Sequence, residues 1–303
     1  MIDIATAIVT YRTPDLVCTL LDSVEKEALA HSLRVVQIVV DNDSQDDTLQ
    51  RIKEFYPKTR AIANTSNQGP AAGFNLAVAK SLELSPSYIL VANSDTEVTP
   101  GSLLRMYEFL ERHRDISAVT GRLYNSDGSL QKQRTSIYPI AMPKRYAPDP
   151  QASLISFVGT TFALIRPEAF SRIGGYDESY YFYNEDLDWS TRAVRAGLNM
   201  AILHGVKIIH HCGRGRRHNV SKITKHLYAS NIYYFKRFYP RLIPLIRVAH
   251  QYEIHHHSRR LKGVKELSQA EIEEGQATYE QALRLMQAEI TAHTTPRIPS
   301  FNF

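Results

Sequence analysis

The feature that most constrains the fold is a regular alternation of short apolar runs and helical segments in the first third of the chain. Runs rich in β-branched residues recur at residues 4–10, 35–40, 60–63 and 88–92. Between the first two runs, Leu16, Leu20 and Val24 recur at helical spacing, which is typical of a helix packed on a sheet. Such alternation predicts parallel βαβ units around one central sheet.

The later part of the chain continues this pattern less regularly. We expect helices at 99–114 and 187–196, strands at 117–121 and 157–165, and a further strand ending at His210. Residues 221–239 and 268–292 predict two long helices beyond the sheet, and a capping box at Ser268–Glu271 marks the start of the second. The expected fold is therefore α/β, a Rossmann-like, mostly parallel central sheet flanked by helices, with a helical C-terminal appendage. We expect a main domain at 1–219, with halves at about 1–98 and 99–219, and an extension at 220–303.

Polar residues follow three of the predicted strands where each strand ends. These segments are Thr10–Arg12, Asp41–Asp43 and Asn93–Asp95. In open α/β sheets the ligand lies beyond the carboxyl ends of the strands. Asp95 is thus placed to hold a divalent ion that bridges two phosphates. From position alone, Asn93 and Asp95 are equally consistent with turn formation.

An acidic stretch inside an aromatic run is the second informative feature. Tyr183–Trp189 contains Glu185, Asp186 and Asp188, and three aromatic residues precede it at 180–182. Burying an ionised acid among rings costs several kcal/mol unless a cation, a metal or a reacting proton compensates. Asp188 lies one helical turn before Arg192 and is explained by a simple ion pair, whereas Asp186 has no such partner.

Two histidines, His210 and His211, end the last predicted strand. A single histidine at such a position is usually structural, but an imidazole is also a ligand for divalent transition ions. An ion at Asp95 and His210, a diphosphate bound to it and a nearby carboxylate that accepts a proton would together form a transfer site.

Composition narrows the remaining possibilities. The chain has 303 residues, a net charge of +5 and only two cysteines, Cys18 and Cys212, which fits a reducing compartment. No apolar run approaches the ~20 residues needed to span a bilayer and the start does not resemble a signal peptide, so we expect a cytoplasmic protein. Basic residues concentrate after Arg214, and Arg214, Arg216 and Arg217 suit phosphates. The glycine-containing turn at 67–75 matches neither the GxGxxG nor the Walker pattern.

Taken together, seven segments in this order resemble a family 2 glycosyltransferase of the GT-A fold, in the branch that contains bacterial rhamnosyltransferases of cell-surface polysaccharide synthesis. The resemblance runs from about Ile4 to Gly215. Its segments are 7–12, 39–42, 67–75, 93–95, 174–178, 183–188 and 210–213.

This resemblance implies a nucleotide-sugar site. Thr10, Arg12 and Asp41 would contact the nucleoside of the donor, Asn67 and Gly73 would shape the same pocket, and Asn93 and Asp95 would lie at the diphosphate. Asp95 and His210 would hold Mn²⁺ or Mg²⁺, with His211 an alternative to His210. The branch implies a rhamnose donor linked to thymidine diphosphate.

The resemblance also implies an acceptor site. Asp186 would be the general base of an inverting transfer, and Glu185 would orient Asp186 or an acceptor hydroxyl. Gly175, Tyr176 and Asp177 would lie along a saccharide or lipid-linked acceptor, and Trp189 would stack on a sugar face.

Three alternatives to this assignment stay open from the sequence. One is a glycosyltransferase that uses a uridine diphosphate sugar, and another is a nucleotidyltransferase, although that chemistry normally wants two carboxylates on the metal. The third is a basic protein that binds nucleic acid or a membrane surface without catalysis. Under the leading hypothesis no nucleic acid is expected, and residues 221–247, which mix aromatic and basic side chains, would contact the inner face of the cell membrane.

Overall fold

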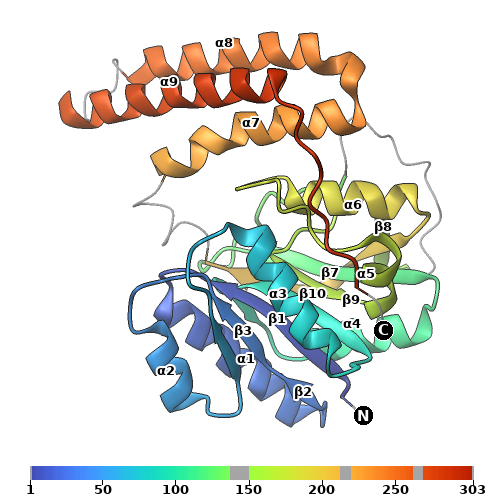
Figure 1. Cartoon of the computed structure of the whole chain (residues 1–303). Coiled ribbons are helices and arrows are strands. Elements are labelled where there is room, and N and C mark those ends of the chain that lie inside the picture. The colour runs from blue at the N-terminus through green and yellow to red at the C-terminus, as the bar shows by residue number, and fades with distance from the viewer. Residues whose placement is uncertain (1, 137–149, 212–219, 262–268, 302–303) are drawn as a thin grey trace. The chain divides into compact units, whose positions relative to one another are not determined.

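The computed structural model describes residues 2–136, 150–211, 220–261 and 269–301 (Figure 1). Two compact units make up the chain. The first comprises residues 1–177, 186–214 and 298–303, and the second comprises residues 178–185 and 215–297. The predicted cluster of Arg214, Arg216 and Arg217 lies outside the described residues.

The first unit contains one ten-stranded sheet. Its strands are β1 Ile4–Thr10, β2 Val35–Val36, β3 Ile38–Asp41, β4 Arg60–Ala63, β5 Tyr88–Asn93, β6 Thr96–Val98, β7 Ile116–Tyr124, β8 Ala152–Ile155, β9 Phe162–Ile165 and β10 Asn199–His210. The order across the sheet is β4-β3-β1-β5-β9-β7-β10-β6, with β2 paired to β1 and β8 paired to β10.

Most of the core pairings are parallel, which confirms the predicted fold class. Strands β2, β3 and β5 each pair in parallel with β1, β4 pairs in parallel with β3, and β7 pairs in parallel with β10. The antiparallel members are β9, between β5 and β7, and the strands β6 and β8 beside β10. The carboxyl ends of β1, β3 and β5 therefore meet at one edge of the sheet.

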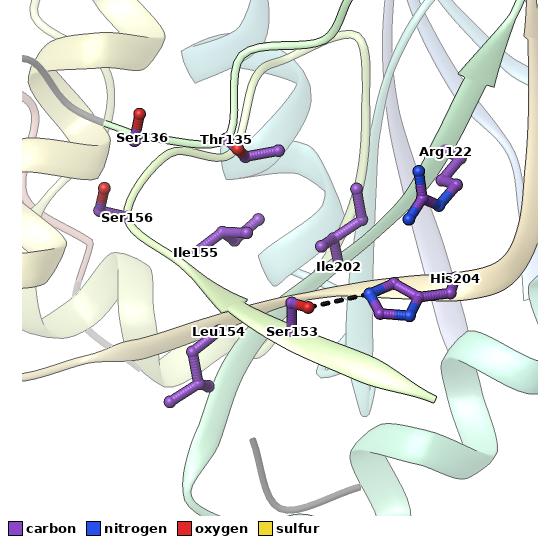
Figure 2. Close-up of a pocket in the computed structure, with 9 residues that line it drawn as sticks. All are labelled: Arg122, Thr135, Ser136, Ser153, Leu154, Ile155, Ser156, Ile202 and His204. Carbon is purple, nitrogen blue, oxygen red and sulfur yellow. Dashed lines mark hydrogen bonds between the residues drawn. The ribbon is translucent and has the colours of Figure 1, made fainter. Parts of the chain in front are cut away.

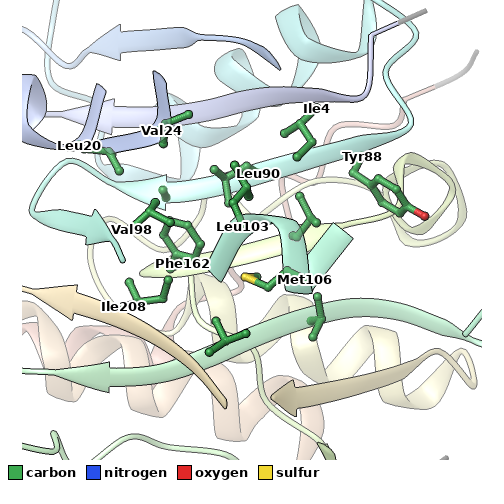
Figure 3. Packing of buried hydrophobic residues seen from close by; sticks show 14 of the residues in the cluster. Ile4, Leu20, Val24, Tyr88, Leu90, Val98, Leu103, Met106, Phe162 and Ile208 are labelled. Atoms are coloured by element: carbon green, nitrogen blue, oxygen red, sulfur yellow. The ribbon is translucent and has the colours of Figure 1, made fainter. Parts of the chain in front are cut away.

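Among the described residues, six helices cover the sheet. They are α1 Pro14–Ala30, α2 Thr48–Phe55, α3 Pro70–Leu82, α4 Ser102–Arg112, α5 Pro167–Ile173 and α6 Glu185–Arg195. One hydrophobic cluster packs α1, α2 and α4 against one face of the sheet, through side chains such as Leu20, Ile52 and Met106. Figure 3 shows Leu20 and Met106 among the side chains of this cluster. A second cluster packs α3, α5 and α6 against the other face, through Phe74, Phe170 and Trp189. Burial on both faces explains why the central strands read as continuous apolar runs.

One expectation about a strand was wrong. The strand predicted at 157–165 begins only at Phe162, because the Ser190 hydroxyl bonds both the amide and the carbonyl of Val158, at 3.1 Å each, in place of a strand neighbour. The helix predicted at 221–239 ends at Phe238, before Pro240. Pro240 opens the 3₁₀ turn Pro240–Leu242, and Pro244 lies in the first turn of α8 Ile243–Leu261, where the backbone N–H that proline lacks has no helical acceptor.

The second unit is helical. Helices α7 Val220–Phe238, α8 and α9 Gln269–Thr291 pack around a small core that includes Tyr228, Ile254 and Met286. Within the described part of the chain, no helix combines the length and apolar character needed to cross a membrane.

Candidate active site

Strand register brings the predicted donor residues to one edge of the sheet. Thr10 on β1 is the partner of Asp41 on β3, and Val9 is the partner of Asn93 on β5. A hydroxyl chain continues along this edge, with Thr13 Oγ1 3.0 Å from Thr10 Oγ1 and 2.8 Å from Ser94 Oγ. The three strand ends named from the sequence thus form one continuous polar surface.

Arg12 is held at this edge by its backbone as well as its side chain. Its φ of +55° lies in the left-handed region, which is costly for a residue with a Cβ. Its amide donates to Ser44 Oγ at 2.8 Å and its Nε donates to the Ser44 carbonyl at 3.2 Å. Ser44 is in turn held by Asp41, whose Oδ2 accepts from the Ser44 amide at 3.2 Å. Asp41 and Arg12 are therefore coupled through Ser44.

Asn67 and Gly73 shape the neighbouring turn. Asn67 Oδ1 accepts from Asn42 Nδ2 at 2.9 Å and from the Gly69 amide at 3.0 Å, which fixes the loop before α3. A Cβ on Gly73 would lie 3.0 Å from Val9 Cγ1, so the glycine allows α3 to approach β1 closely. Asn67 and Gly73 therefore shape the loop and the start of α3, which border the polar edge of the sheet.

Asp95 and His210 lie together across the antiparallel pairing of β6 and β10. Nε2 of His210 is 3.4 Å from Oδ1 of Asp95. The other ring nitrogen, Nδ1, is 3.0 Å from Gln131 Oε1, while Nε2 of Gln131 donates to the His210 carbonyl at 2.7 Å. Since the amide orientation of Gln131 is fixed in this way, the His210 Nδ1 carries the proton that it shares with Gln131. Nε2 then points at Asp95 either as a second donor or as a lone pair toward a shared cation.

His211 has different neighbours. Its Nε2 is 3.2 Å from Glu97 Oε2 and its Nδ1 is 2.8 Å from Ser126 Oγ. Its amide donates to the Asp95 carbonyl at 2.8 Å, which helps to fix the backbone that carries the Asp95 carboxylate. Of the two histidines, His210 is thus the one whose ring faces Asp95.

The side chains around Asp95 supply part of the coordination that a divalent ion needs. Within the ranges that the structure describes, no group of three or more histidine, cysteine or acidic side chains converges. Two protein ligands suit Mg²⁺ or Mn²⁺ when the substrate's phosphates and water complete the shell. Adjacent ligand atoms roughly 2.1 Å from such an ion lie about 3 Å apart, so Asp95 and His210 fit this role after a small adjustment.

Asp186 is the second residue of α6 and has an altered acidity. Its side chain is half-buried, and burial raises the pKa of Asp186 to about 6, against the lowering effects of the Leu187 amide, the Arg134 charge and the Thr160 amide. The Leu187 amide donates to Asp186 Oδ1 at 2.8 Å. A carboxylate with such a pKa can exchange a proton near neutral pH.

The loop before β9 ties Asp186 to the sheet edge. The Thr160 amide is one of the groups that stabilise the Asp186 carboxylate, and the carbonyl of the next residue, Thr161, accepts from the Asn93 amide at 3.0 Å. The backbone at 160–161 therefore has contacts with the head of α6 and with the end of β5. This loop connects the predicted base to the predicted donor edge.

The backbone that leads into α6 is unusual. Tyr183 and Asn184 both have positive φ, +67° and +70°, and two consecutive non-glycine residues in this region are costly. They precede Glu185, which is 5% exposed and opens the helix. Carboxylates in the first turn are favoured by the helix dipole.

Asp188 has the structural role that the sequence predicted. It is fully buried, and its Oδ1 accepts from Arg192 Nε at 2.7 Å. Arg192 also donates through Nη2 to the Gly175 carbonyl at 2.6 Å and bonds the Ile173 carbonyl. The pair holds the turn after α5.

The predicted acceptor residues are not available to a ligand in this structure. Tyr176, Asp177 and Trp189 are 2%, 0% and 1% exposed. The Trp189 ring packs against Phe170 and Tyr176, at centroid distances of 5.5 and 6.1 Å, so its predicted stacking on a sugar is corrected to a core role.

Gly175 is equally enclosed. Its amide donates to the Pro299 carbonyl at 2.9 Å, and a Cβ there would lie 2.4 Å from Asn75 Oδ1. This turn supports α6, and an acceptor would have to contact other groups.

Sequence reasoning missed Gln131, Arg134 and Phe157. Gln131 orients His210, and the Arg134 guanidinium carbon lies 5.8 Å from the centre of the Phe157 ring. Gly159 connects this pair to the base, since a Cβ on it would lie 3.5 Å from Phe157 and 3.2 Å from Asp186 Oδ2. Residues 131 and 133 are both polar and both form hydrogen bonds with β7. This alternation of polar residues is the sequence signal that could have identified the segment as part of the site.

Comparison with known protein families gives a match over more than half of the chain. Residues 6–174 match the model described as glycosyl transferase family 2. An N-acetylglucosaminyl-diphospho-decaprenol L-rhamnosyltransferase of Mycobacterium tuberculosis is 25% identical over an alignment of 211 residues that covers 61% of this chain and 69% of that protein. Rhamnosyltransferase WbbL of Escherichia coli K12 is 23% identical over an alignment of 222 residues that covers 66% of this chain and 82% of that protein.

Solved structures with the same fold include TarS of S. aureus. Its residues 1–349 in complex with UDP match with a TM-score of 0.57 at 15% identity, over 95% of this chain and 89% of that chain. The same fragment in complex with UDP-GlcNAc gives a TM-score of 0.55 at 14% identity, over 95% of this chain and 91% of that chain. At this identity the likeness shows the fold alone.

Proposed function

Since the chain belongs to glycosyl transferase family 2, we propose that it transfers a sugar, with inversion, from a nucleoside-diphosphate donor to a saccharide or lipid-linked acceptor. The observation that carries this proposal is the Asp186 carboxylate, with a pKa of about 6, tied through residues 160–161 to the strand edge at Asn93. Such a base is mostly ionised at neutral pH and can still accept a proton. The names of the two rhamnosyltransferase relatives support a role in cell-surface polysaccharide synthesis.

In this proposal the donor lies along the carboxyl edge of β1, β3 and β5. Thr10, Arg12 and Asp41 bind the nucleoside, and the turn with Asn67 and Gly73 forms the pocket wall. Asn93 and Asp95 lie at the diphosphate. Asp95 and His210 would hold Mn²⁺ or Mg²⁺, which when bound neutralises the negative charge of the leaving nucleoside diphosphate.

The protein's own residues carry the proton transfer. Asp186 accepts the proton of an acceptor hydroxyl, and that oxygen attacks the anomeric carbon opposite the leaving diphosphate. The bond between the anomeric carbon and the phosphate oxygen breaks, so the configuration inverts. Glu185, next to Asp186 in the first turn of α6, orients the base or the acceptor hydroxyl. The Leu187 amide holds one oxygen of Asp186, which fixes the direction of the carboxylate.

For the donor we propose L-rhamnose linked to thymidine diphosphate, on the basis of the two relatives' names. The UDP and UDP-GlcNAc complexes of TarS make a uridine diphosphate sugar the second candidate. A thermal-shift panel with Mn²⁺ separates them, since a ligand that binds only the folded protein raises its melting temperature. A larger shift with uridine than with thymidine nucleotides would overturn the rhamnose assignment.

The transfer mechanism is tested with a purified donor and acceptor. Asp186→Asn should reduce turnover by roughly 10²–10⁴-fold while the affinity for the nucleoside diphosphate stays within twofold of the wild type. Asp95→Asn should instead weaken binding of nucleotide and Mn²⁺ together. Asp15→Asn, on the exposed side of α1, is the matched control and should leave both unchanged. Normal turnover by Asp186→Asn would contradict the assignment of the base.

We further propose that α8 contacts an anionic membrane surface. Leu245, Val248 and Tyr252 are 66%, 64% and 72% exposed and follow one another at helical spacing. Arg241 and Arg247, both exposed, flank this stripe. Apolar side chains beside arginines suit a bilayer with acidic headgroups. The sequence had placed the contact over 221–247, but Tyr228, Tyr233 and Tyr234 of α7 are buried.

Vesicle co-sedimentation tests this surface. Binding should require acidic lipid, and Val248→Asp should abolish it, because a carboxylate would replace an apolar side chain next to Arg247. Leu29→Asp, at a residue of α1 that is 75% exposed, is the matched control and should bind as the wild type does. A concentration-dependent dimer that Val248→Asp dissolves, without lipid binding, would show that a second copy covers the stripe.

A further inference from the structure

A cavity of about 380 Å³ opens beside β8, and none of the residues assigned above to donor, metal or base lines it (Figure 2). One end is basic. Arg122 of β7 and His204 of β10 lie at this end, and Nε2 of His204 is 2.9 Å from the Ser153 hydroxyl of β8. The volume falls within the range of roughly 300–1,000 Å³ that is common for small-molecule sites.

The other end of the cavity carries hydroxyl groups. Thr135, Ser136 and Ser156 line it, and the Ser156 amide donates to the Thr135 carbonyl at 3.1 Å, which holds the two segments together. Ile155 and Ile202 lie between the hydroxyl end and the basic end (Figure 2). Hydroxyl partners around an apolar floor match a sugar ring, which has polar edges and apolar C–H faces.

The charge of Arg122 has no counterpart in the cavity. None of the nine residues that line the cavity carries a carboxylate. Across the described ranges of the chain, the half-buried Arg122 side chain takes part in no hydrogen bond or ion pair. A partly desolvated guanidinium is strongly favoured by a planar oxyanion that accepts two of its N–H groups.

We propose that this cavity binds a sugar that carries an oxyanion, either a phosphate or a carboxylate, with Arg122 holding the anion and the hydroxyl end holding the ring. One residue that lines the cavity is next in sequence to a residue that acts on the candidate base. Thr135 follows Arg134, the cation whose charge acts on Asp186. We assign this sugar to the acceptor of the transfer reaction. That assignment rests on the proposed function, whereas the binding of the sugar to the cavity does not.

The test observes the cavity directly by NMR of isoleucine methyl groups. Glucose 1-phosphate, glucuronic acid and glucose are titrated separately into the full chain, with UDP and Mg²⁺ present to occupy the donor edge. The Ile155 and Ile202 signals should move with at least one of the two anionic sugars, and glucose should bind at least tenfold more weakly. The tighter of the two anionic sugars identifies phosphate or carboxylate as the recognised group.

Variants assign the contacts. Arg122→Gln should weaken binding of the anionic sugar at least tenfold, and Ser136→Ala should weaken it about two- to fivefold. Arg60→Gln, which removes an exposed arginine at the start of β4, should bind as the wild type does. Equal affinity for glucose, unchanged affinity in Arg122→Gln, or shifts confined to other isoleucines would each overturn the proposal. Since no turnover is measured, a failed transferase assay would leave this result standing.

Discussion

The Nε2 atom of His210 lies 3.4 Å from Oδ1 of Asp95, although the two residues are separated by more than a hundred positions in the chain. The register of β6 against β10, with Thr96 opposite His210, produces this contact. Because Nδ1 of His210 is already engaged by Gln131, the ring can present only Nε2 to Asp95. Gln131 therefore orients the histidine ring that would bind a cation there.

Replacing Gln131 should accordingly weaken metal binding without removing a ligand. We expect Gln131→Leu to lower the affinity for Mn²⁺, measured with the nucleoside diphosphate present, by roughly 10–100-fold. The physical reason is that His210 loses the acceptor that fixes its tautomer and ring orientation. Gln50→Leu, on the exposed side of α2, should leave the affinity unchanged. An unaltered affinity in Gln131→Leu would place the cation away from His210.

Substitutions of Asp186 and Asp188 by asparagine should have opposite effects on the free energy of unfolding at pH 7. The pKa of Asp186 is raised from 3.8 to about 6, so the folded state binds this proton more tightly than the unfolded chain does. Its contribution is favourable below pH 3.8 and is lost as the pH rises toward 6. Asp186→Asn should therefore raise the free energy of unfolding at pH 7 by about 1–2 kcal/mol. This is less than the pKa shift of a fully buried carboxylate would give, because the Asp186 side chain is only half-buried. The substitution should have little effect near pH 3.5.

Asp188→Asn should do the opposite. It leaves the Arg192 guanidinium in a buried site without its carboxylate, which should cost about 3 kcal/mol at pH 7. Urea denaturation of both variants at two pH values checks the pair of predictions. A destabilised Asp186→Asn at pH 7 would mean that the carboxylate is held in place by contacts worth more than its burial costs.

The charge of Arg134 should shift the acid limb of the activity profile, which Asp186 sets. Its positive charge favours the ionised form of Asp186 and lowers the pKa of that carboxyl. Arg134→Gln should shift the midpoint of the acid limb upward by a few tenths of a pH unit, because the guanidinium is exposed and water screens it. The matched change Arg195→Gln, at the exposed end of α6, should leave the profile in place. The kcat profile should be recorded at saturating substrate, so that changes in binding do not enter the midpoint.

The strand ends that carry Thr10, Asp41 and Asn93 were predictable because the signals are local. Each follows an apolar run whose length and composition mark a buried strand, and parallel strands share a carboxyl edge. The Asp188–Arg192 pair was predictable for the same reason, since one helical turn separates the two residues.

Contacts across the chain could not be obtained in this way. Gln131 contacts His210 from 79 positions away, and nothing in either local sequence fixes that register. The burial of Trp189 depends on the packing of α5 and α6 against the same face of the sheet. The sequence around Trp189, with three acidic neighbours in the same helix, is compatible with either an exposed or a buried tryptophan. The family resemblance does not distinguish between these two positions either.

Asn75 illustrates a long-range contact whose energetic effect can be measured. From inside α3 its Nδ2 donates to the Tyr176 carbonyl at 2.9 Å, and its Oδ1 accepts from the Tyr176 amide at 2.8 Å. Asn75→Ala removes both bonds in a buried site and should lower the free energy of unfolding by about 2–4 kcal/mol. Asn75→Asp keeps the acceptor for the amide but sets a carboxylate against the carbonyl, so it should be no more stable than the alanine variant. Urea denaturation with an unchanged m-value checks the ranking, and a loss below about 1 kcal/mol in Asn75→Ala would show that the turn at Gly175 is held mainly by Pro299 and Arg192.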